Sequence, residues 1–264
     1  MELAVRHLNI TAAMKGGAAS DIVRDVSFSV SCGDKLAVVG GSGCGKTMTA
    51  MSILGLLPDN CRATGSILWN GKDLLSLPPK KRRKLLGVEH VLIPQSGADF
   101  LNPSLTVKRQ MSEALARIGV ASGARKAVMY QLLEGVGFSE PEKVLGSYPF
   151  QLSGGMSQRV VTAMASAGKP KLVVADEPTK GIDQSNKEQF LINLDTLFSE
   201  AAVMLITHDI SVAAACNYIM VMKDGVVEEY GETSKVLLHP QSGYTHQLIC
   251  DLPHALSHIE RGLA

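Results

Sequence analysis

The segment GGSGCGKT, residues 40–47, decides the fold of this chain. It follows KLAVVG (35–40), a short apolar run that predicts a buried strand. It opens KTMTAMSILGLL (46–57), whose pattern predicts a helix that Pro58 stops. A glycine-rich loop between a buried strand and a helix is a setting in which backbone N–H groups converge on a phosphate. The sequence therefore predicts a nucleotide phosphate site in this loop.

The loop matches the pattern G-x-x-x-x-G-K-[ST], in which the lysine reaches the β- and γ-phosphates and the hydroxyl binds Mg²⁺. Lys46 and Thr47 occupy these two positions. The residues that we expect to contact ATP from the loop and the first helical turn are Gly40, Ser42, Gly43, Cys44, Gly45, Lys46, Thr47 and Met48.

Two further apolar runs end in residues suited to phosphate chemistry. LVVAD (172–176) ends in Asp176, which could hold Mg²⁺ through water, and Glu177 could then orient or deprotonate an attacking water. A carboxylate that only caps the following Pro-Thr turn is the alternative. His208 ends the next run, so in a parallel sheet it would lie at the same edge.

Alternation of strands and helices predicts an α/β fold with a mostly parallel sheet. Alternating patterns at 3–10 and 22–30 predict antiparallel strands, and an Asn-Gly turn predicts a hairpin over 65–74. The pattern is helical over 104–160, and 218–231 predicts a terminal hairpin with an Asp-Gly turn. We expect a P-loop NTPase core of mostly parallel sheet, with an N-terminal antiparallel β subdomain and an inserted helical subdomain.

Composition narrows the class of partner. The chain has 264 residues and a net charge of +1, so electrostatics gives no reason to expect nucleic acid. The basic run KKRRK (80–84) favours a solvated helix face over a contact for phosphates or lipid headgroups. Five scattered cysteines indicate a reducing compartment. No signal peptide or membrane-spanning apolar run is evident, so action at a membrane would need partners.

Taken together, the motifs resemble those of the ATP-binding cassette (ABC) ATPases over nearly the whole chain. The family's motifs occur in order as Walker A at 40–47, the Q-loop Gln95, the signature LSGGM at 152–156, Walker B at 172–176, the catalytic Glu177, the D-loop Asp183 and the switch His208. The resemblance implies MgATP hydrolysis with Glu177 as base, assisted by His208, and with Thr47, Gln95 and Asp176 around Mg²⁺.

The resemblance also implies a single ABC ATPase domain. Its nucleotide-binding core would span 1–95 and 161–235, its helical and signature subdomain 96–160, and its C-terminal tail 236–264.

In this family two cassettes face head to tail. Ser153, Gly154 and Gly155 would then contact ATP held by a partner, and the helix from about Gln158 would point its positive end at the phosphate. Alternatively, that helix N-terminus lies in the core with Ser153 as its cap.

The finer likeness is to importers of the oligopeptide, dipeptide and nickel group. The segments that carry it are 56–75, 94–107, 148–160 and the tail HPQSGYTHQLICDLP at 239–253. The likeness implies a second ATPase subunit (a different paralogue or a second copy), two membrane permeases and an extracytoplasmic solute-binding protein. It places the chain on the cytoplasmic face of a bacterial membrane, with peptide, nickel or metal chelate as cargo.

Three other functions are weighed against this one. A soluble ABC ATPase acting on nucleic acid or ribosomes commonly carries two cassettes or a coiled-coil insertion, and neither is present here. A P-loop kinase lacks the signature and His208. A non-hydrolysing cassette is disfavoured by Glu177.

Three departures from the family pattern stand out. The first loop (11–22) has no aromatic residue to stack on adenine, so Met14 or Ile22 would supply the apolar contact and affinity would be weaker. The D-loop reads KGID. Ser157 stands where arginine or glutamine is usual, without an explanation at this level.

Overall fold

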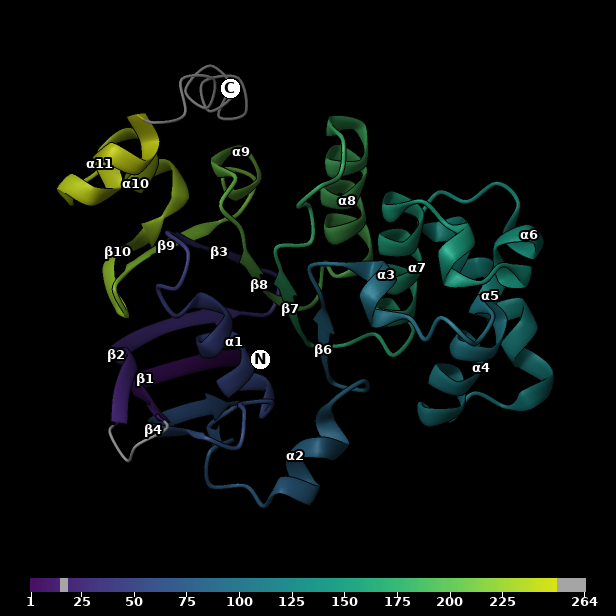
Figure 1. Ribbon diagram of the computed structural model, residues 1–264, viewed down its shortest axis with the longest axis horizontal. Coiled ribbons are helices and arrows are strands. Elements are labelled where there is room, and N and C mark those ends of the chain that lie inside the picture. The colour runs from purple at the N-terminus through teal and green to yellow at the C-terminus, as the bar shows by residue number, and fades with distance from the viewer. Residues whose placement is uncertain (15–18, 251–264) are drawn as a thin grey trace. The chain divides into compact units, whose positions relative to one another are not determined.

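The computed structural model describes residues 1–14 and 19–250 (Figure 1). The chain forms two compact units. The first comprises Met1–Arg83 and the described residues from Ala201 onward, and the second comprises Lys84–Glu200. The predicted division into core, helical subdomain and tail follows other boundaries and stays a prediction.

One sheet of the first unit is antiparallel, with strand order β2-β1-β4-β5. Its strands are β1 (Glu2–Ala13), β2 (Ala19–Ser31), β4 (Cys61–Trp69) and β5 (Lys72–Asp73). Alternate residues of β1, such as Leu3 and Val5, are buried, as the apolar–polar alternation requires. Asn70 and Gly71 both have positive φ angles, 50° and 77°, as a type I′ hairpin turn needs. The two predicted antiparallel strands and the hairpin are confirmed, although β4 begins before Gly65, at Cys61.

The second set of strands in this unit is mainly parallel. The strand β3 (Lys35–Gly40) lies between β8 (Ala202–Ile206) and β9 (Tyr218–Lys223), parallel to both. These runs are apolar and almost wholly buried, as expected for strands covered on both faces. The strand β10 (Val226–Glu232) pairs antiparallel with β9 through an Asp-Gly turn, which confirms the terminal hairpin.

The helices of the first unit are α1 (Lys46–Leu54), α9 (Ile210–Ala213), α10 (Thr233–Leu238) and α11 (Gly243–Cys250). The prediction that the first helix runs to residue 57 is wrong. Gly55 adopts a left-handed conformation (φ 72°), and its N–H bonds the carbonyls of Met51 and Ser52. This glycine cap ends α1 before Pro58 can do so.

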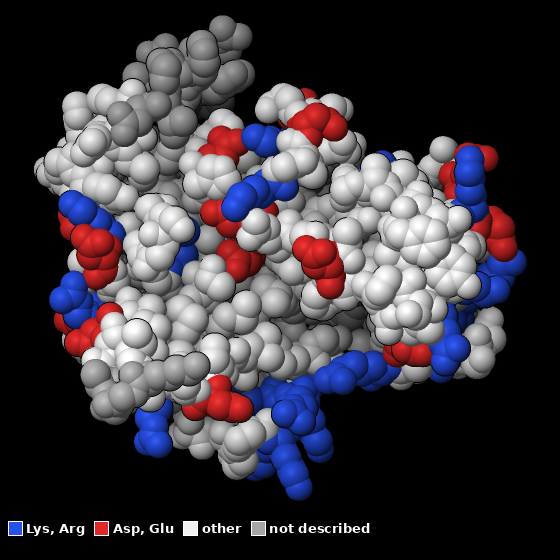
Figure 2. Space-filling view, viewed as in Figure 1, with Lys and Arg blue, Asp and Glu red and all other residues white. Residues whose placement is uncertain are grey.

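The basic run forms the short helix α2 (Pro79–Leu85), where the two units meet in sequence. Figure 2 shows a gathering of blue side chains at the place of α2. Lys80 and Lys81 are exposed there, as predicted for a solvated face. Arg82 differs, because it is half-buried and donates to the carbonyl of Ser52.

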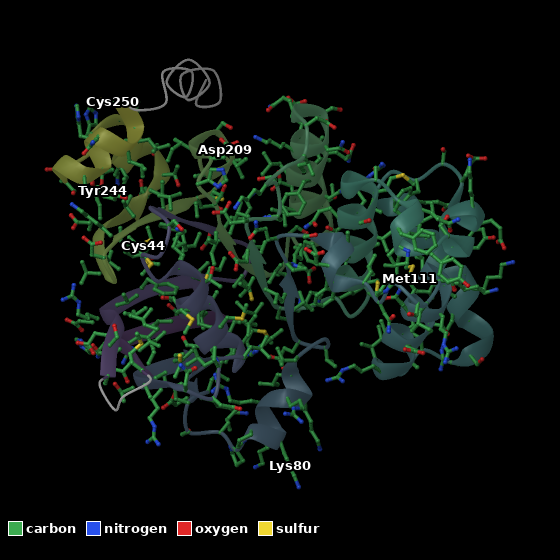
Figure 3. The ribbon with its side chains drawn as sticks, viewed as in Figure 1. Cys44, Lys80, Met111, Asp209, Tyr244 and Cys250 are labelled. Atoms are coloured by element: carbon green, nitrogen blue, oxygen red, sulfur yellow. The ribbon has the colours of Figure 1, made fainter. Side chains whose placement is uncertain are left out.

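The second unit combines two parallel strands with a helical block. The strands are β6 (His90–Ile93) and β7 (Leu172–Asp176). The helices are α3 (Gly97–Phe100), α4 (Val107–Arg117), α5 (Arg125–Gly135), α6 (Pro141–Gly146), α7 (Gly154–Ser166) and α8 (Gln184–Leu197). Met111 of α4 (labelled in Figure 3), Leu133 of α5 and Val160 of α7 belong to one buried apolar cluster. The predicted helical block is confirmed, and two of the breaks between its helices contain short 3₁₀ turns, at Ser122–Ala124 and Pro149–Gln151.

Among residues 1–14 and 19–250, none of the helices has the length and apolar character needed to cross a bilayer.

Glycine 65 offers a test of the antiparallel sheet. Gly65 and Gly71 both have left-handed φ, 99° and 77°, but a β-carbon on Gly65 would lie 2.3 Å from the carbonyl oxygen of His7, whereas one on Gly71 meets nothing within 4 Å. We expect Gly71→Ala to cost about 1–2 kcal/mol of unfolding free energy for the conformation alone. Gly65→Ala should cost at least about 3 kcal/mol, or prevent folding, because the collision adds to that strain. Urea unfolding of both variants measures the difference, and equal losses would contradict the collision.

Candidate nucleotide-binding site

The glycine loop between β3 and α1 fits closely against neighbouring strands of the first unit. A β-carbon on Gly40 would lie 2.0 Å from the carbonyl oxygen of Met222 in β9. One on Gly45 would lie 2.8 Å from a methyl group of Val23 in β2. Both glycines also have positive φ angles, 150° and 98°. These two positions therefore need glycine for packing as well as for the turn.

Lys46 places a cation at the centre of this loop. Its side chain is only 8% exposed, and its ammonium donates to the carbonyl oxygens of Gly40 (2.9 Å) and Gly41 (2.8 Å). The same nitrogen lies 3.6 Å from Sγ of Cys44, a free thiol. The loop thus holds a nearly buried positive charge against two neutral carbonyl groups, which suits the site to an anion.

A pocket opens over the loop and the start of α1. It is lined by Ile22, Gly43, Cys44, Gly45, Lys46, Thr47 and Met48. Gly40 and Ser42 are the predicted loop residues outside this lining. Ile22 supplies an apolar wall, whereas Met14, the other residue proposed for the base, is not part of the lining and is 56% exposed.

His208 lies at the same edge of the parallel strands as the loop. It follows β8, which runs parallel to β3 with Ile206 opposite Val38. The N–H of Thr207 continues this pairing by donating to the carbonyl of Val38 (3.1 Å). The side chain of His208 is exposed. Asp209, labelled in Figure 3, fixes the next turn because its carboxylate accepts from the N–H of Ser211 (3.0 Å).

Gln95 and Asp176 lie at the carboxyl ends of the two parallel strands of the second unit. Ile93 of β6 pairs with Ala175 of β7, so Gln95 and Asp176 follow the paired ends of neighbouring parallel strands. Glu177 has a left-handed backbone, with φ 49°. A non-glycine residue in this region costs on the order of 1–3 kcal/mol, and such strain concentrates at functional sites.

The segment around Gln95 is held by α7. The side-chain amide of Gln158 donates to the carbonyl of Pro94 (3.1 Å). A β-carbon on Gly97 would lie 2.6 Å from the carbonyl carbon of Ser157, so α3 and α7 approach closely. Ser157 is fully buried at this contact. A longer arginine or glutamine side chain at position 157 would need space in the buried interior that neighbouring residues occupy.

The signature segment is itself the start of a helix. The expectation of a helix from about Gln158 is wrong, because α7 begins at Gly154. Ser153 is its N-cap, and its hydroxyl accepts from the N–H of Met156 (3.3 Å). A serine cap starts the helix despite two glycines in its first turn. Ser153 and Gly154 are exposed, so the N-terminus of α7 is open to solvent in this chain.

The D-loop residue Asp183 is hydrogen-bonded to Asn186, whose side chain lies beside Gly155 of the signature. Asp183 is the N-cap of α8, and its carboxylate accepts from the backbone N–H (3.0 Å) and the side-chain amide (2.7 Å) of Asn186. These bonds, the backbone one most of all, lower the pKa of Asp183. A β-carbon on Gly155 would lie 3.0 Å from the same side-chain amide. Asn186 therefore links the D-loop to the signature, a role that the sequence pattern did not reveal.

We expect Asn186→Ala to raise the pKa of Asp183 only part of the way to its ordinary value. The side-chain donor is lost, whereas the backbone N–H, which contributes most to the lowering, remains. Titration of the Asp183 carboxyl by NMR, with the signal assigned through Asp183→Asn, measures this change. Gln184→Ala is the matched control, since Gln184 bonds Glu188 instead. An unchanged pKa in Asn186→Ala would contradict the bond.

Tyr244 is a second residue that sequence reasoning missed. Its hydroxyl accepts from the N–H of Gly41, at the entrance to the glycine loop, over 3.1 Å. The sequence pattern at 239–253 carries the family likeness of this segment but does not predict a contact with the loop.

A buried lysine in a glycine loop between a parallel strand and a helix defines the class of P-loop nucleotide-binding proteins. Comparison with known proteins refines this class. The family model described as "ABC transporter" matches residues 23–180. The chain therefore belongs to the ABC transporter family, in its ATP-binding subunits, and the resemblance stated from the motifs is confirmed.

Two relatives align over most of their length. The chain is 34% identical to the metal-staphylopine import system ATP-binding protein CntD of Staphylococcus aureus, over 98% of this chain and 97% of that protein. It is 40% identical to the dipeptide transport ATP-binding protein DppD of Bacillus subtilis, over 95% of this chain and 76% of that protein.

The fold agrees with a solved structure of an ATP-binding cassette. The dimeric, post-hydrolysis structure of the cassette MJ0796 bound to ADP and Pi gives a TM-score of 0.77 at 25% identity, covering 88% of this chain and 98% of that one. The predicted fold class, an ABC cassette with a P-loop core, an antiparallel N-terminal sheet and inserted helices, is confirmed.

Proposed function

We propose that this chain is the ATP-hydrolysing subunit of an importer for peptides or metal chelates. ATP drives two cassettes together, and hydrolysis and product release separate them. The observation that carries the proposal is the cation of Lys46, which is nearly buried in a glycine loop and donates to two carbonyl groups and a thiol of that loop. Relatives that transport dipeptides or metal-staphylopine support the choice of cargo class.

The glycine loop binds the phosphates of ATP in this proposal. Backbone N–H groups of Gly43 to Met48 surround the phosphate oxygens, and the N-terminus of α1 adds partial positive charge. Lys46 exchanges its bonds to the loop carbonyls for bonds to the β- and γ-phosphates. The adenine ring of ATP lies against Ile22 and is not stacked on an aromatic side chain of the pocket lining.

Oxygen donors suited to Mg²⁺ are available at the ends of strands and in the first turn of α1. Thr47 has an exposed side chain, and Gln95 and Asp176 follow neighbouring strand ends, so hydroxyl, amide and carboxylate oxygens are offered. These are the ligand types that Mg²⁺ takes. We propose that these three residues hold Mg²⁺. When bound, the ion neutralises charge on the β- and γ-phosphates.

Glu177 serves as the base that orients and deprotonates the attacking water. His208 and Gln95 help to stabilise charge that develops on the γ-phosphate. Asp183 and the signature residues act between subunits, with Ser153, Gly154 and Gly155 closing over ATP held by a partner cassette. The dimeric structure of the MJ0796 cassette supports this arrangement.

The remaining partners follow from the importer role. We propose two permease subunits, an extracytoplasmic solute-binding protein and a second ATPase subunit, with the chain held on the cytoplasmic face of the membrane through the permeases. Co-purification of the tagged chain with permeases tests this. A chain that hydrolyses ATP but never associates with a membrane protein would overturn it.

Glu177→Gln should bind MgATP with near-native affinity but lose turnover by at least about 100-fold, because the general base is removed while the phosphate contacts remain. The variant should accumulate as an ATP-bound dimer. ATPase assays, nucleotide binding and size-exclusion chromatography measure the three effects. Glu134→Gln, an exposed glutamate of α5, serves as control and should behave as wild type. Near-native turnover of Glu177→Gln would remove this residue from the base role.

Gly154→Ala tests the role of the signature between subunits. A β-carbon at Gly154 meets nothing within 4 Å in this chain, so folding and nucleotide binding by the monomer should be unchanged. ATPase activity should fall by about 10- to 100-fold, because the methyl group would intrude where a partner's ATP is held. Gly146→Ala, which also points into open space, is the matched control. Full activity in Gly154→Ala would argue against a signature contact with ATP.

A further inference from the structure

The C-terminal tail is fixed to the strand β10 by carboxylates. One oxygen of Glu229 accepts from the N–H of Gln241 (3.0 Å), and the other accepts from the N–H of Ser242 (3.1 Å). The hydroxyl of Ser242 donates to Glu228 (2.9 Å) and accepts from the N–H of Tyr244 (3.2 Å). These bonds set the position at which α11 begins, and α11 carries Tyr244.

Tyr244 in turn reaches the glycine loop. Its hydroxyl accepts from the N–H of Gly41 (3.1 Å), and the ammonium of Lys223 lies 4.9 Å from the centre of its ring. Figure 3 shows Tyr244 on α11 near the loop that carries Cys44. A β-carbon on Gly41 would lie 3.4 Å from the tyrosine hydroxyl, so the two residues are in direct contact.

Gly41 is therefore held from two sides. Its N–H is bonded to Tyr244, and its carbonyl oxygen accepts from the ammonium of Lys46 (2.8 Å). Neither Gly41 nor Tyr244 belongs to the lining of the pocket over the loop. The tyrosine thus supports the loop from outside the pocket and can keep its bond when a nucleotide binds.

We propose that Tyr244 is a positioning residue of the nucleotide site, through which the tail braces the glycine loop. It fixes the peptide of Gly41, and thereby the loop on which the Lys46 ammonium rests, in the conformation that accepts phosphates. The tail of residues 239–250 is then part of the machinery for nucleotide binding. This inference rests on the proposed function, because it presupposes that the loop binds ATP.

The test is Tyr244→Phe in the full chain, which removes the hydroxyl and keeps the ring. We expect the Kd for MgATP, and the KM for ATP hydrolysis, to rise about threefold to tenfold, the usual effect of losing one hydrogen bond. We expect kcat to stay within about twofold, since the hydroxyl does not touch the reacting atoms.

The matched control is Tyr230→Phe. Tyr230 lies in β10 of the same unit and also bonds a backbone group with its hydroxyl, the carbonyl of Ser29 (2.7 Å), but not the loop. It should change neither Kd nor KM. Both variants should have similar melting temperatures, so that a change in affinity confined to Tyr244→Phe cannot be ascribed to stability.

A second variant tests the route through the tail. Ser242→Ala removes the hydroxyl that joins β10 to the backbone of Tyr244, and it should weaken MgATP binding in the same direction. If both residues act on the loop by one route, the double variant that combines Tyr244→Phe with Ser242→Ala should lose less affinity for MgATP than the product of the two single fold-changes.

The outcomes separate this inference from the proposed function. A wild-type chain that does not bind MgATP would sink the proposed function itself. A wild-type chain that binds MgATP, together with a Tyr244→Phe variant whose affinity equals that of Tyr230→Phe, would overturn only the role of Tyr244. Tighter binding in Tyr244→Phe would also overturn it.

Discussion

The close approach of the glycine loop to the strands beside it is the constraint on which the first unit depends. At Gly40 the backbone lies so near to β9 that a single added carbon would overlap a carbonyl oxygen of that strand. Gly45 is packed in a similar way against β2. This packing leaves the loop carbonyls pointing at the ammonium of Lys46, which is held almost out of contact with water. A charge held this way is costly unless it is well bonded, and an arriving phosphate can replace those bonds with stronger ones.

In the second unit, the first turns of α7 contact several segments that carry family motifs. The same short helix start carries the signature, buries Ser157 against α3 and, through Gln158, holds the backbone just before Gln95. One turn away from these contacts, Gly155 leaves room for Asn186, which binds the D-loop carboxylate. Three segments that the family motifs name separately are therefore joined through one helix and its neighbours. At Gly97 and Gly155, where an added β-carbon would meet a neighbouring segment, close packing would transmit the displacement to that segment.

Much of the fold and the candidate site could be predicted from local pattern. Buried strands such as 35–40 are apolar after their first residue, and turns such as Asn70-Gly71 carry the residues that positive φ requires, so each is recognisable on its own. Helix ends were less predictable. Pro58 is the expected stop of α1, but Gly55 ends it earlier. Ser153 is a possible cap in the sequence, yet the helix that follows it begins at Gly154 and not near Gln158, because the serine cap outweighs the low helix propensity of two glycines.

The sequence by itself determined the P-loop, its lysine and the order of the motifs, and with them the family, because each is a contiguous pattern whose chemistry requires those residue types. Only the tertiary structure decided that Ile22 lines the pocket, that α3 approaches the backbone of α7 at Ser157, and that Tyr244 bonds Gly41. Gly41 and Tyr244 are separated by 203 residues of chain. Ile22 belongs to β2, whereas the loop that it faces follows β3. Such contacts arise from the way strands and helices pack, and no local pattern of residues encodes which distant side chain will meet which backbone group.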